Sequence, residues 1–282
     1  MIDFHTYPVM IKEIYENDDE LYKVVKNVFG FGFPPQPLDL FFMEMREAGV
    51  EKAVLLPLDC SKRHNCEIVS NEIITELMNK YSYFIGFASV DPTMENACLK
   101  LEEAIINLGL KGLNLDPAIQ GFFIDDKTNA YPIYELCQSL KIPIIIHCGL
   151  NWSPSALVKY SRPYMLDEVA LNFPDLSIVI SHFGWPWVDE ALMIAIKRPN
   201  VYLDTAILYS GTPSETYKKI FESHIGLEVL ERSLRTKILF GSNYPRIDMR
   251  RSVRGINNLC LSNEFKEMVF NDNAKTLLGF KE

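Results

Sequence analysis

Short apolar segments rich in β-branched residues alternate with longer amphipathic segments along the chain. This alternation predicts strands followed by helices, and the connections are long enough for right-handed crossovers between parallel strands. Eight such repeats predict an α/β fold, a (β/α)8 TIM barrel. The expected strands are 1–5, 52–58, 84–90, 111–115, 142–147, 176–182, 201–206 and 237–242. Helical spacing is clearest at 71–81, 97–109 and 131–141.

The length of the chain fits one barrel. Its 282 residues lie close to the roughly 250 that this fold needs, and no linker or low-complexity tract divides them, so we expect a single domain over 1–282. A Gly- and Pro-rich insertion at about 8–37 follows the first strand and is a possible lid. Its Phe29, Phe31 and Phe33 either form a substrate wall or pack the insertion onto the barrel.

Composition and charge narrow the classes of partner. The chain is 48% hydrophobic, has a formal net charge of −9 and therefore offers no basic face to nucleic acid or an anionic membrane. A small-molecule substrate is the expected partner. We find no signal peptide and expect a cytoplasmic protein, and the six scattered cysteines are typical of reduced thiols. The sequence leaves the oligomeric state open, and a homodimer is compatible with it.

Three of the five histidines end predicted strands, namely His5, His147 and His182. The carboxyl ends of parallel strands converge on one face of a barrel, where imidazoles from separate strands can surround zinc or iron. A single histidine at such a place is more often a hydrogen-bonded structural residue. Alternation along a strand places Tyr7 on the same side as His5 and turns Cys148 away from His147.

The other two histidines are weaker candidates for a functional site. His64 lies between Cys60 and Cys66, but a metal site there lacks a fourth ligand with the usual pairing. His224 lies in a polar helical stretch and is expected at the surface.

The sequence resembles the amidohydrolase superfamily over nearly its whole length, in the branch that contains aminocarboxymuconate-semialdehyde decarboxylase and related hydrolases and lactonases. The resemblance rests on motifs at successive strand ends. They are Ile2-Asp3-Phe4-His5, Ile146-His147-Cys148-Gly149, Ser181-His182-Phe183-Gly184-Trp185-Pro186, Leu239-Phe240-Gly241-Ser242-Asn243-Tyr244-Pro245 and the terminal Asn273-Ala274-Lys275-Thr276-Leu277-Leu278.

The resemblance implies a site in which a His-x-His pair and the histidine matching His147 hold a divalent metal, with zinc favoured. The histidine matching His182 positions or polarises the substrate, and an aspartate on the last strand binds metal and handles the proton. This chain departs from the pattern twice, with Tyr7 in the first motif and Asn243 in place of the aspartate. An amide cannot act as a general base, and a neutral phenol is a poor metal ligand.

Three functions remain open on these residues. The leading one is an amidohydrolase-like hydrolase of a small carboxylated molecule. Such an enzyme would cleave a C–O or C–N bond, as a lactonase does, and could work without a metal. The second is a metal-dependent hydrolase or decarboxylase (a carboxy-lyase) with a reduced ligand set, His5, His147 and His182. The third is a barrel that binds a small molecule without catalysis.

We assign roles to the candidate residues accordingly. His147, His182 and Asn243 are the expected catalytic residues, and Tyr7, Trp185 and Arg246 are expected to bind the substrate. Arginine suits a substrate carboxylate because its guanidinium donates two parallel hydrogen bonds. Four aspartates near strand ends could replace the missing base or could serve as turn residues and caps. They are Asp59, Asp91, Asp116 and Asp204.

Overall fold

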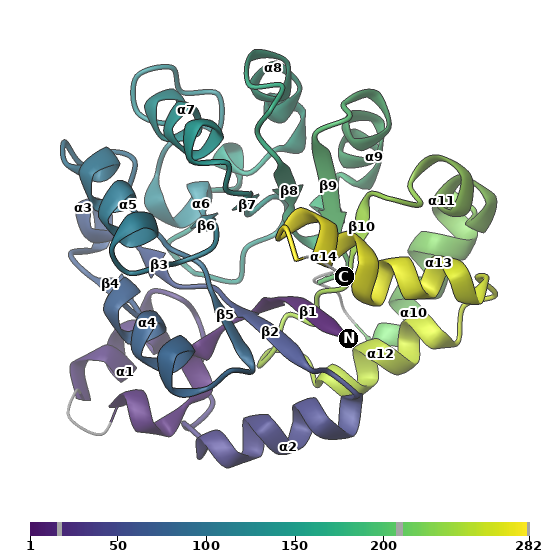
Figure 1. The fold of residues 1–282 in the computed structure, drawn as a ribbon, viewed down its shortest axis with the longest axis horizontal. Helices are drawn as coiled ribbons and strands as arrows, with labels where there is room; N and C mark the ends of the chain where they lie inside the picture. Colours follow the sequence, from purple (N-terminus) through teal and green to yellow (C-terminus); the bar gives the residue numbers. More distant parts are fainter. Residues whose placement is uncertain (16–18, 207–210, 281–282) are drawn as a thin grey trace.

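Eight short parallel strands form a ring, and helices surround it (Figure 1). The computed structural model describes residues 1–15, 19–206 and 211–280. Each strand lies within or overlaps one of the eight predicted segments, so the TIM-barrel prediction is confirmed. The strands are β1 (Ile2–Thr6), β2 (Lys52–Leu55), β5 (Phe84–Gly86), β6 (Leu113–Leu115), β7 (Ile144–Ile146), β8 (Ile178–Ile180), β9 (Val201–Asp204) and β10 (Ile238–Leu239).

The strands pair in chain order around the ring. One parallel run is β1-β2-β5 and the other is β10-β9-β8-β7-β6. Single parallel bridges join the two runs, between Ala88 and Leu113 on one side and between Thr6 and Tyr244 on the other. The ring is therefore closed, and its carboxyl ends face one side.

Helices cover the outside of the strands, so the strands are almost entirely buried. The whole of β7, for example, is isoleucine and is buried. The helices are α1 (Asp19–Asn27), α2 (Leu38–Ala48), α3 (Ser61–His64), α4 (Asn71–Lys80), α5 (Ala97–Ile106), α6 (Pro117–Gln120), α7 (Tyr131–Leu140), α8 (Leu166–Asn172), α9 (Val188–Lys197), α10 (Pro213–Tyr217), α11 (Leu227–Ser233), α12 (Met249–Asn257), α13 (Asn263–Glu267) and α14 (Asn273–Leu277).

A small hairpin interrupts the repeat after β2. The predicted strand 52–58 ends at Leu55, because Pro57 has no backbone N–H with which to continue the ladder. The chain then forms β3 (Leu58–Asp59) and β4 (Glu67–Ile68), which pair antiparallel with α3 between them. This hairpin was not predicted from the sequence.

The insertion after β1 folds back on itself before α2. Its two ends pair, since Lys12 N donates to Gln36 O at 2.7 Å and Gln36 N donates to Met10 O at 2.7 Å. Phe29 and Phe31 are buried, whereas Phe33 is 63% exposed. A lid role for this segment stays a prediction.

The last helix, α14, packs at the end of the barrel where the motif Asn273–Leu278 predicted a closing helix. The side-chain amide of Asn273 donates to Ile238 O in β10 at 2.8 Å. Among the described residues, every helix is too short or too polar to cross a bilayer.

Candidate active site

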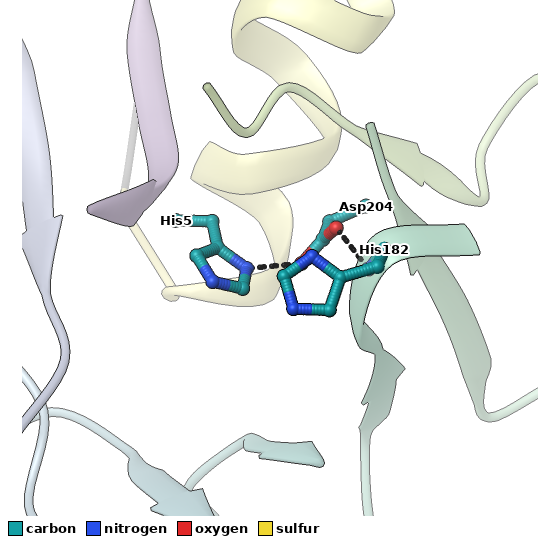
Figure 2. A group of neighbouring side chains, drawn as sticks. All are labelled: His5, His182 and Asp204. Atoms are coloured by element: carbon teal, nitrogen blue, oxygen red, sulfur yellow. Dashed lines mark hydrogen bonds and ion pairs between the residues drawn. The ribbon is translucent and has the colours of Figure 1, made fainter. Parts of the chain in front are cut away.

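His5 and Asp204 meet at the carboxyl-end face of the barrel. His5 lies near the end of β1, Asp204 ends β9, and both side chains are buried. His5 Nδ1 lies 2.7 Å from Asp204 Oδ2, as the dashed line in Figure 2 shows. The other carboxylate oxygen, Oδ1, accepts the backbone N–H groups of His182 at 2.7 Å and of Ala206 at 3.0 Å.

These contacts fix the charge of Asp204. Burial alone would raise the pKa of its carboxyl, but the electrostatic effect and hydrogen bond of the neighbouring His5 and the contacts with His182 hold that pKa below its usual value. Because a carboxylate only accepts, His5 must carry its proton on Nδ1.

Tyr7 completes a chain of three side chains. Its hydroxyl oxygen lies 2.7 Å from His5 Nε2. With the proton of His5 on Nδ1, Nε2 accepts the phenol proton, and the remaining lone pairs of the Tyr7 oxygen are free to face the adjacent cavity. Burial raises the pKa of Tyr7 well above its usual value, so the side chain remains a neutral phenol.

His182 and His147 form a second pair. His182 Nδ1 donates to the Ala206 carbonyl, which leaves Nε2 as an acceptor, 3.1 Å from His147 Nδ1. His147 Nε2 is also 3.2 Å from the Leu150 carbonyl. A neutral imidazole has one N–H, so His147 can donate to only one of these two acceptors at a time.

Both imidazoles are neutral at physiological pH. Burial, and then the electrostatic effect of the neighbouring His5, lowers the pKa of His147 to about 3. Burial, followed by His147 and His5, lowers the pKa of His182 well below its usual value. The site therefore disfavours additional positive charge on this pair.

Asn243 stands where the resemblance implies an aspartate, and both its backbone and its side chain are unusual. Its backbone has φ +64°, a left-handed conformation that asparagine tolerates better than most residues. Its side chain is fully buried, yet neither Oδ1 nor Nδ2 has a hydrogen-bond partner among the described residues. An unpaired buried amide costs free energy, which a bound ligand would recover.

Asp116 lies at the end of β6 and has two roles in the structure. Its Oδ1 caps α6 by accepting Ile119 N at 3.1 Å, and Oδ2 accepts Asn151 Nδ2 at 2.6 Å. Oδ2 also lies 3.7 Å from His147 Nδ1. Burial raises the pKa of Asp116 to about 6. A carboxyl with this pKa is suited to proton transfer near neutral pH.

Arg246 follows the strand-eight motif and is held by the insertion. Its Nη2 donates to Phe29 O at 2.7 Å and Nη1 to Gly30 O at 3.3 Å, and the guanidinium carbon lies 4.7 Å from the centroid of the Phe29 ring. Burial lowers the pKa of the guanidinium. Among the described residues it forms no ion pair with a carboxylate, so it is a cation available to an anionic ligand.

These side chains surround a small inner cavity that borders a larger outer one. The inner cavity has a volume of about 10 Å³, which is about the room that one water molecule needs. Its walls are Tyr7, Phe29, Asp116, His147, Asn151, Trp152, His182, Asn243 and Arg246. The outer cavity, of about 370 Å³, is lined by Phe33, Trp152, Gly211, Pro213, Arg246, Ile247, Asp248 and Arg251. Trp152 and Arg246 belong to both, so they form the boundary between the two.

One group of donors could hold a metal ion. His5, His182 and Asp204 offer ligand atoms that all lie within 4.8 Å of one another (Figure 2). Two imidazoles and a carboxylate suit zinc, manganese or iron, so the donor types fit such an ion. To bind an ion through its Nδ1, His5 would have to give up the proton that it now directs at Asp204. His147, expected as a ligand, lies outside this group and contacts His182 instead.

The structure brings most of the sequence-derived candidates together, with three exceptions. Trp185 lines a separate hollow with His224 and other residues. Asp59 accepts from Ser61 N at 3.0 Å, and Asp91 accepts from Thr93 N at 3.0 Å, so both serve as turn residues. The sequence interpretation missed Asn151 and Trp152, although their position directly after β7 was a usable signal.

Comparison with known proteins agrees with this fold. The family model described as "Amidohydrolase" matches residues 2–280. Among curated proteins, Protein fluG of Emericella nidulans is 28% identical over 101 residues. That match covers 36% of this chain and only 11% of the length of fluG.

Solved structures align over nearly the whole chain. An uncharacterised TIM-barrel protein of Bordetella bronchiseptica has a TM-score of 0.78 at 27% identity, covering 99% of this chain and 98% of the other. A dihydroxybenzoic acid decarboxylase of Polaromonas sp. JS666, solved with manganese and 2-nitroresorcinol, has a TM-score of 0.67 at 17% identity, covering 100% and 97%. A probable 2-pyrone-4,6-dicarboxylic acid hydrolase of Acinetobacter baumannii, solved with citric acid, has a TM-score of 0.62 at 15% identity, covering 99% of each. At such identities the last two show the fold alone.

Proposed function

Because the chain belongs to the amidohydrolase family, we propose that it is an enzyme that hydrolyses a small cyclic ester or related carbonyl compound bearing a carboxylate. One observation carries the proposal. The inner cavity has room for about one water molecule, between the Asp116 carboxyl and the unpaired amide of Asn243. A hydrolytic site needs this combination of a water position, a base and a hydrogen-bond donor for the developing oxyanion.

The attacking water is held by two acceptors. Asp116 accepts one of its protons, and the Tyr7 oxygen, whose own proton faces His5, accepts the other. A lone pair of the water is then left to attack the substrate carbonyl. With a pKa of about 6, Asp116 is ionised at neutral pH and takes the proton as the new C–O bond forms.

Asn243 and the histidine pair support this step. Asn243 Nδ2–H donates to the carbonyl oxygen as it gains negative charge, which an aspartate at this position could not do. When the tetrahedral species collapses, the bond to the leaving oxygen breaks and that oxygen takes the proton from Asp116. His147 and His182 act as positioning residues, since His147 lies beside both Asp116 and His182.

Arg246 is the proposed anchor for the substrate carboxylate. It lies on the boundary between the two cavities and has no acidic partner among the described residues. The outer cavity, at about 370 Å³, is within the usual range for small ligands and also contains Arg251. A ring held there can direct its carboxylate to Arg246 and its carbonyl to the inner cavity. The hydrolase from Acinetobacter, whose name refers to a dicarboxylated pyrone, supports the choice of substrate class.

A second candidate function is a metal-assisted hydrolase or decarboxylase. The close group of His5, His182 and Asp204, together with the manganese in the related decarboxylase, favours it. A divalent ion bound there would polarise a carbonyl or carboxylate oxygen of the substrate. In that case Asp116 and Arg246 would keep the roles of proton-transfer group and carboxylate anchor.

The test is a panel of cyclic lactones, with and without a carboxylate, and of carboxylated phenols. We expect hydrolysis of the carboxylated lactones, and a KM about 10- to 100-fold higher in Arg246→Lys, because lysine cannot donate two parallel hydrogen bonds. The uncarboxylated lactones provide the matched control, because their KM should not change in the variant. Absence of lactone turnover, with or without added zinc or manganese, would overturn the hydrolase proposal.

Two measurements separate the candidates. Elemental analysis of protein purified without chelator gives the metal content, and carbon dioxide release from the carboxylated phenols reports decarboxylation. Stoichiometric metal with release of carbon dioxide supports the second candidate. Hydrolysis that persists after chelation supports the first.

A further inference from the structure

Two cysteines face each other in the β3–β4 hairpin, whose loop contacts α6. In the hairpin, Asp59 pairs with Glu67, so Cys60 and Cys66 are opposed at the next position. Cys60 N donates to Cys66 O at 3.1 Å, and the two sulfur atoms are 3.4 Å apart. Directly opposed residues that share a backbone hydrogen bond have Cα atoms about 5.5 Å apart, within the range of disulfides.

We propose that Cys60 and Cys66 form a reversible redox pair that a hydroperoxide converts to a disulfide. Cys66 is partly exposed and Cys60 is buried, so Cys66 is the sulfur that the oxidant reaches first. The hydrogen bond from Cys60 lowers the pKa of Cys66, which favours its reactive thiolate. All six cysteines are free thiols in the structure, which therefore represents the reduced form.

The chemistry proceeds in two balanced steps. The Cys66 thiolate attacks the hydroperoxide and the O–O bond breaks, which gives Cys66 sulfenic acid and an alkoxide, or hydroxide from hydrogen peroxide. The leaving group takes from solvent the proton that the Cys66 thiol had released, and becomes an alcohol or water. The Cys60 sulfur then attacks the sulfenic sulfur, an S–S bond forms, and water leaves with the thiol proton. Two thiols are oxidised by one hydroperoxide, which is reduced.

The hairpin loop that this pair would close contacts α6, the helix that begins after Asp116. Between the two cysteines, Arg63 donates to Ala118 O at 3.1 Å and to Ser155 O at 2.9 Å, and His64 Nε2 donates to Ile119 O at 3.2 Å. Ala118 and Ile119 belong to α6, the helix that Asp116 caps. A disulfide between Cys60 and Cys66 would close the loop that carries Arg63 and His64, and would so hold their contacts with α6 in place.

The experiment uses the full chain treated with one equivalent of hydrogen peroxide. We expect the loss of two of the six thiols, and a Cys60–Cys66 cross-linked peptide in non-reducing mass spectrometry that disappears with dithiothreitol. The short loop closed by the bond should raise Tm by about 5 °C. Cys260→Ser, which removes an exposed thiol elsewhere, is the matched control and should still form the cross-link.

Two variants test the order of the steps. Cys66→Ser should lose the cross-link and leave Cys60 unmodified, because the buried sulfur is out of reach of the oxidant. Cys60→Ser should leave a Cys66 sulfenic acid that a cyclic dione traps. If the wild-type chain keeps both thiols free while Cys260 is oxidised, or if Cys60 is oxidised first, the proposal is overturned. None of these readouts depends on the proposed hydrolase activity.

Discussion

His5 and Asp204, 199 positions apart in the sequence, meet with Nδ1 of the imidazole 2.7 Å from Oδ2 of the carboxylate. Both side chains are buried, and Asp204 also accepts two backbone N–H groups, from His182 after β8 and from Ala206 after β9. The contact sets which nitrogen of His5 carries the proton and, through Tyr7, which polar atom faces the inner cavity. His5 and Asp204 do not line the inner cavity, yet through Tyr7 they would set how the proposed water is held there.

Asp204→Asn should preserve the fold and impair catalysis. The amide oxygen can still accept from His182 N and Ala206 N, but the amide N–H then faces His5 Nδ1. The proton of His5 moves to Nε2, the Tyr7 hydroxyl turns its proton into the cavity, and the water loses an acceptor. We expect kcat to fall about 10²-fold with Tm changed by only a few degrees.

Asp175→Asn provides the control for this variant, because Asp175 is exposed and distant from the site. Its kcat and Tm should match the wild type. Equal kcat in Asp204→Asn and Asp175→Asn would show that the His5–Asp204 contact has no part in the reaction.

The rate of hydrolysis should depend on pH through Asp116. The base acts as the carboxylate, so kcat/KM should rise as the pH increases through about 6 and then level off. Asp116→Asn should lower kcat by about 10²- to 10⁴-fold and remove this step in the pH profile. Asparagine remains a good cap for α6, so circular dichroism should be unchanged. A pH profile that stays intact in the variant would assign the base elsewhere.

Restoring the family pattern should strengthen metal binding. Tyr7→His with Asn243→Asp adds one imidazole and one carboxylate beside His5, in a cavity where the amide has no partner in the described part of the chain. We expect zinc affinity, measured by competition with a chromogenic chelator, to rise by at least about 10-fold. The same pair of changes should remove the amide donor and lower the metal-free rate. Unchanged zinc affinity would mean that these two positions do not limit metal binding.

Gly149 should be essential for the stability of the loops that carry the site. It has φ +103°, and a Cβ there would overlap the carbonyl oxygen of Trp185, so the loops after β7 and β8 approach as closely as their backbones allow. Gly149→Ala should lower the free energy of unfolding by about 3 kcal/mol in urea denaturation. Gly32→Ala is the control, since its Cβ would meet nothing within 4 Å, and it should be almost neutral.

The barrel and the meeting of three histidines could be predicted because both follow from periodicity. In parallel strands, a polar residue that ends an apolar run lies on the carboxyl-end face, and this placed His5, His147 and His182 correctly near one another. Their roles in metal binding and catalysis stay predictions. The extra hairpin was missed because β3 and β4 have two residues each, too few to produce a pattern.

The side-chain contacts within the site could not be predicted, because they depend on the direction in which each side chain points and not only on its position along the chain. Asp204 was one of four candidate aspartates, and nothing in the sequence showed that its side chain reaches His5 while those of Asp59 and Asp91 bond within their own turns. Asn243 could be recognised as a departure from the family. Nothing in the sequence indicated its left-handed backbone or that its side chain is without a hydrogen-bond partner among the residues described.

The guanidinium of Arg246 is positioned by main-chain carbonyls of the insertion, at Phe29 and Gly30, and not by any residue of the strands. In the proposed function, the insertion would therefore orient the carboxylate anchor, whereas Asp116, the proposed base, follows a barrel strand. Exchange of the insertion between paralogues would move the guanidinium of Arg246 and leave the proposed reacting groups in place. New substrate specificities could therefore evolve on an unchanged barrel.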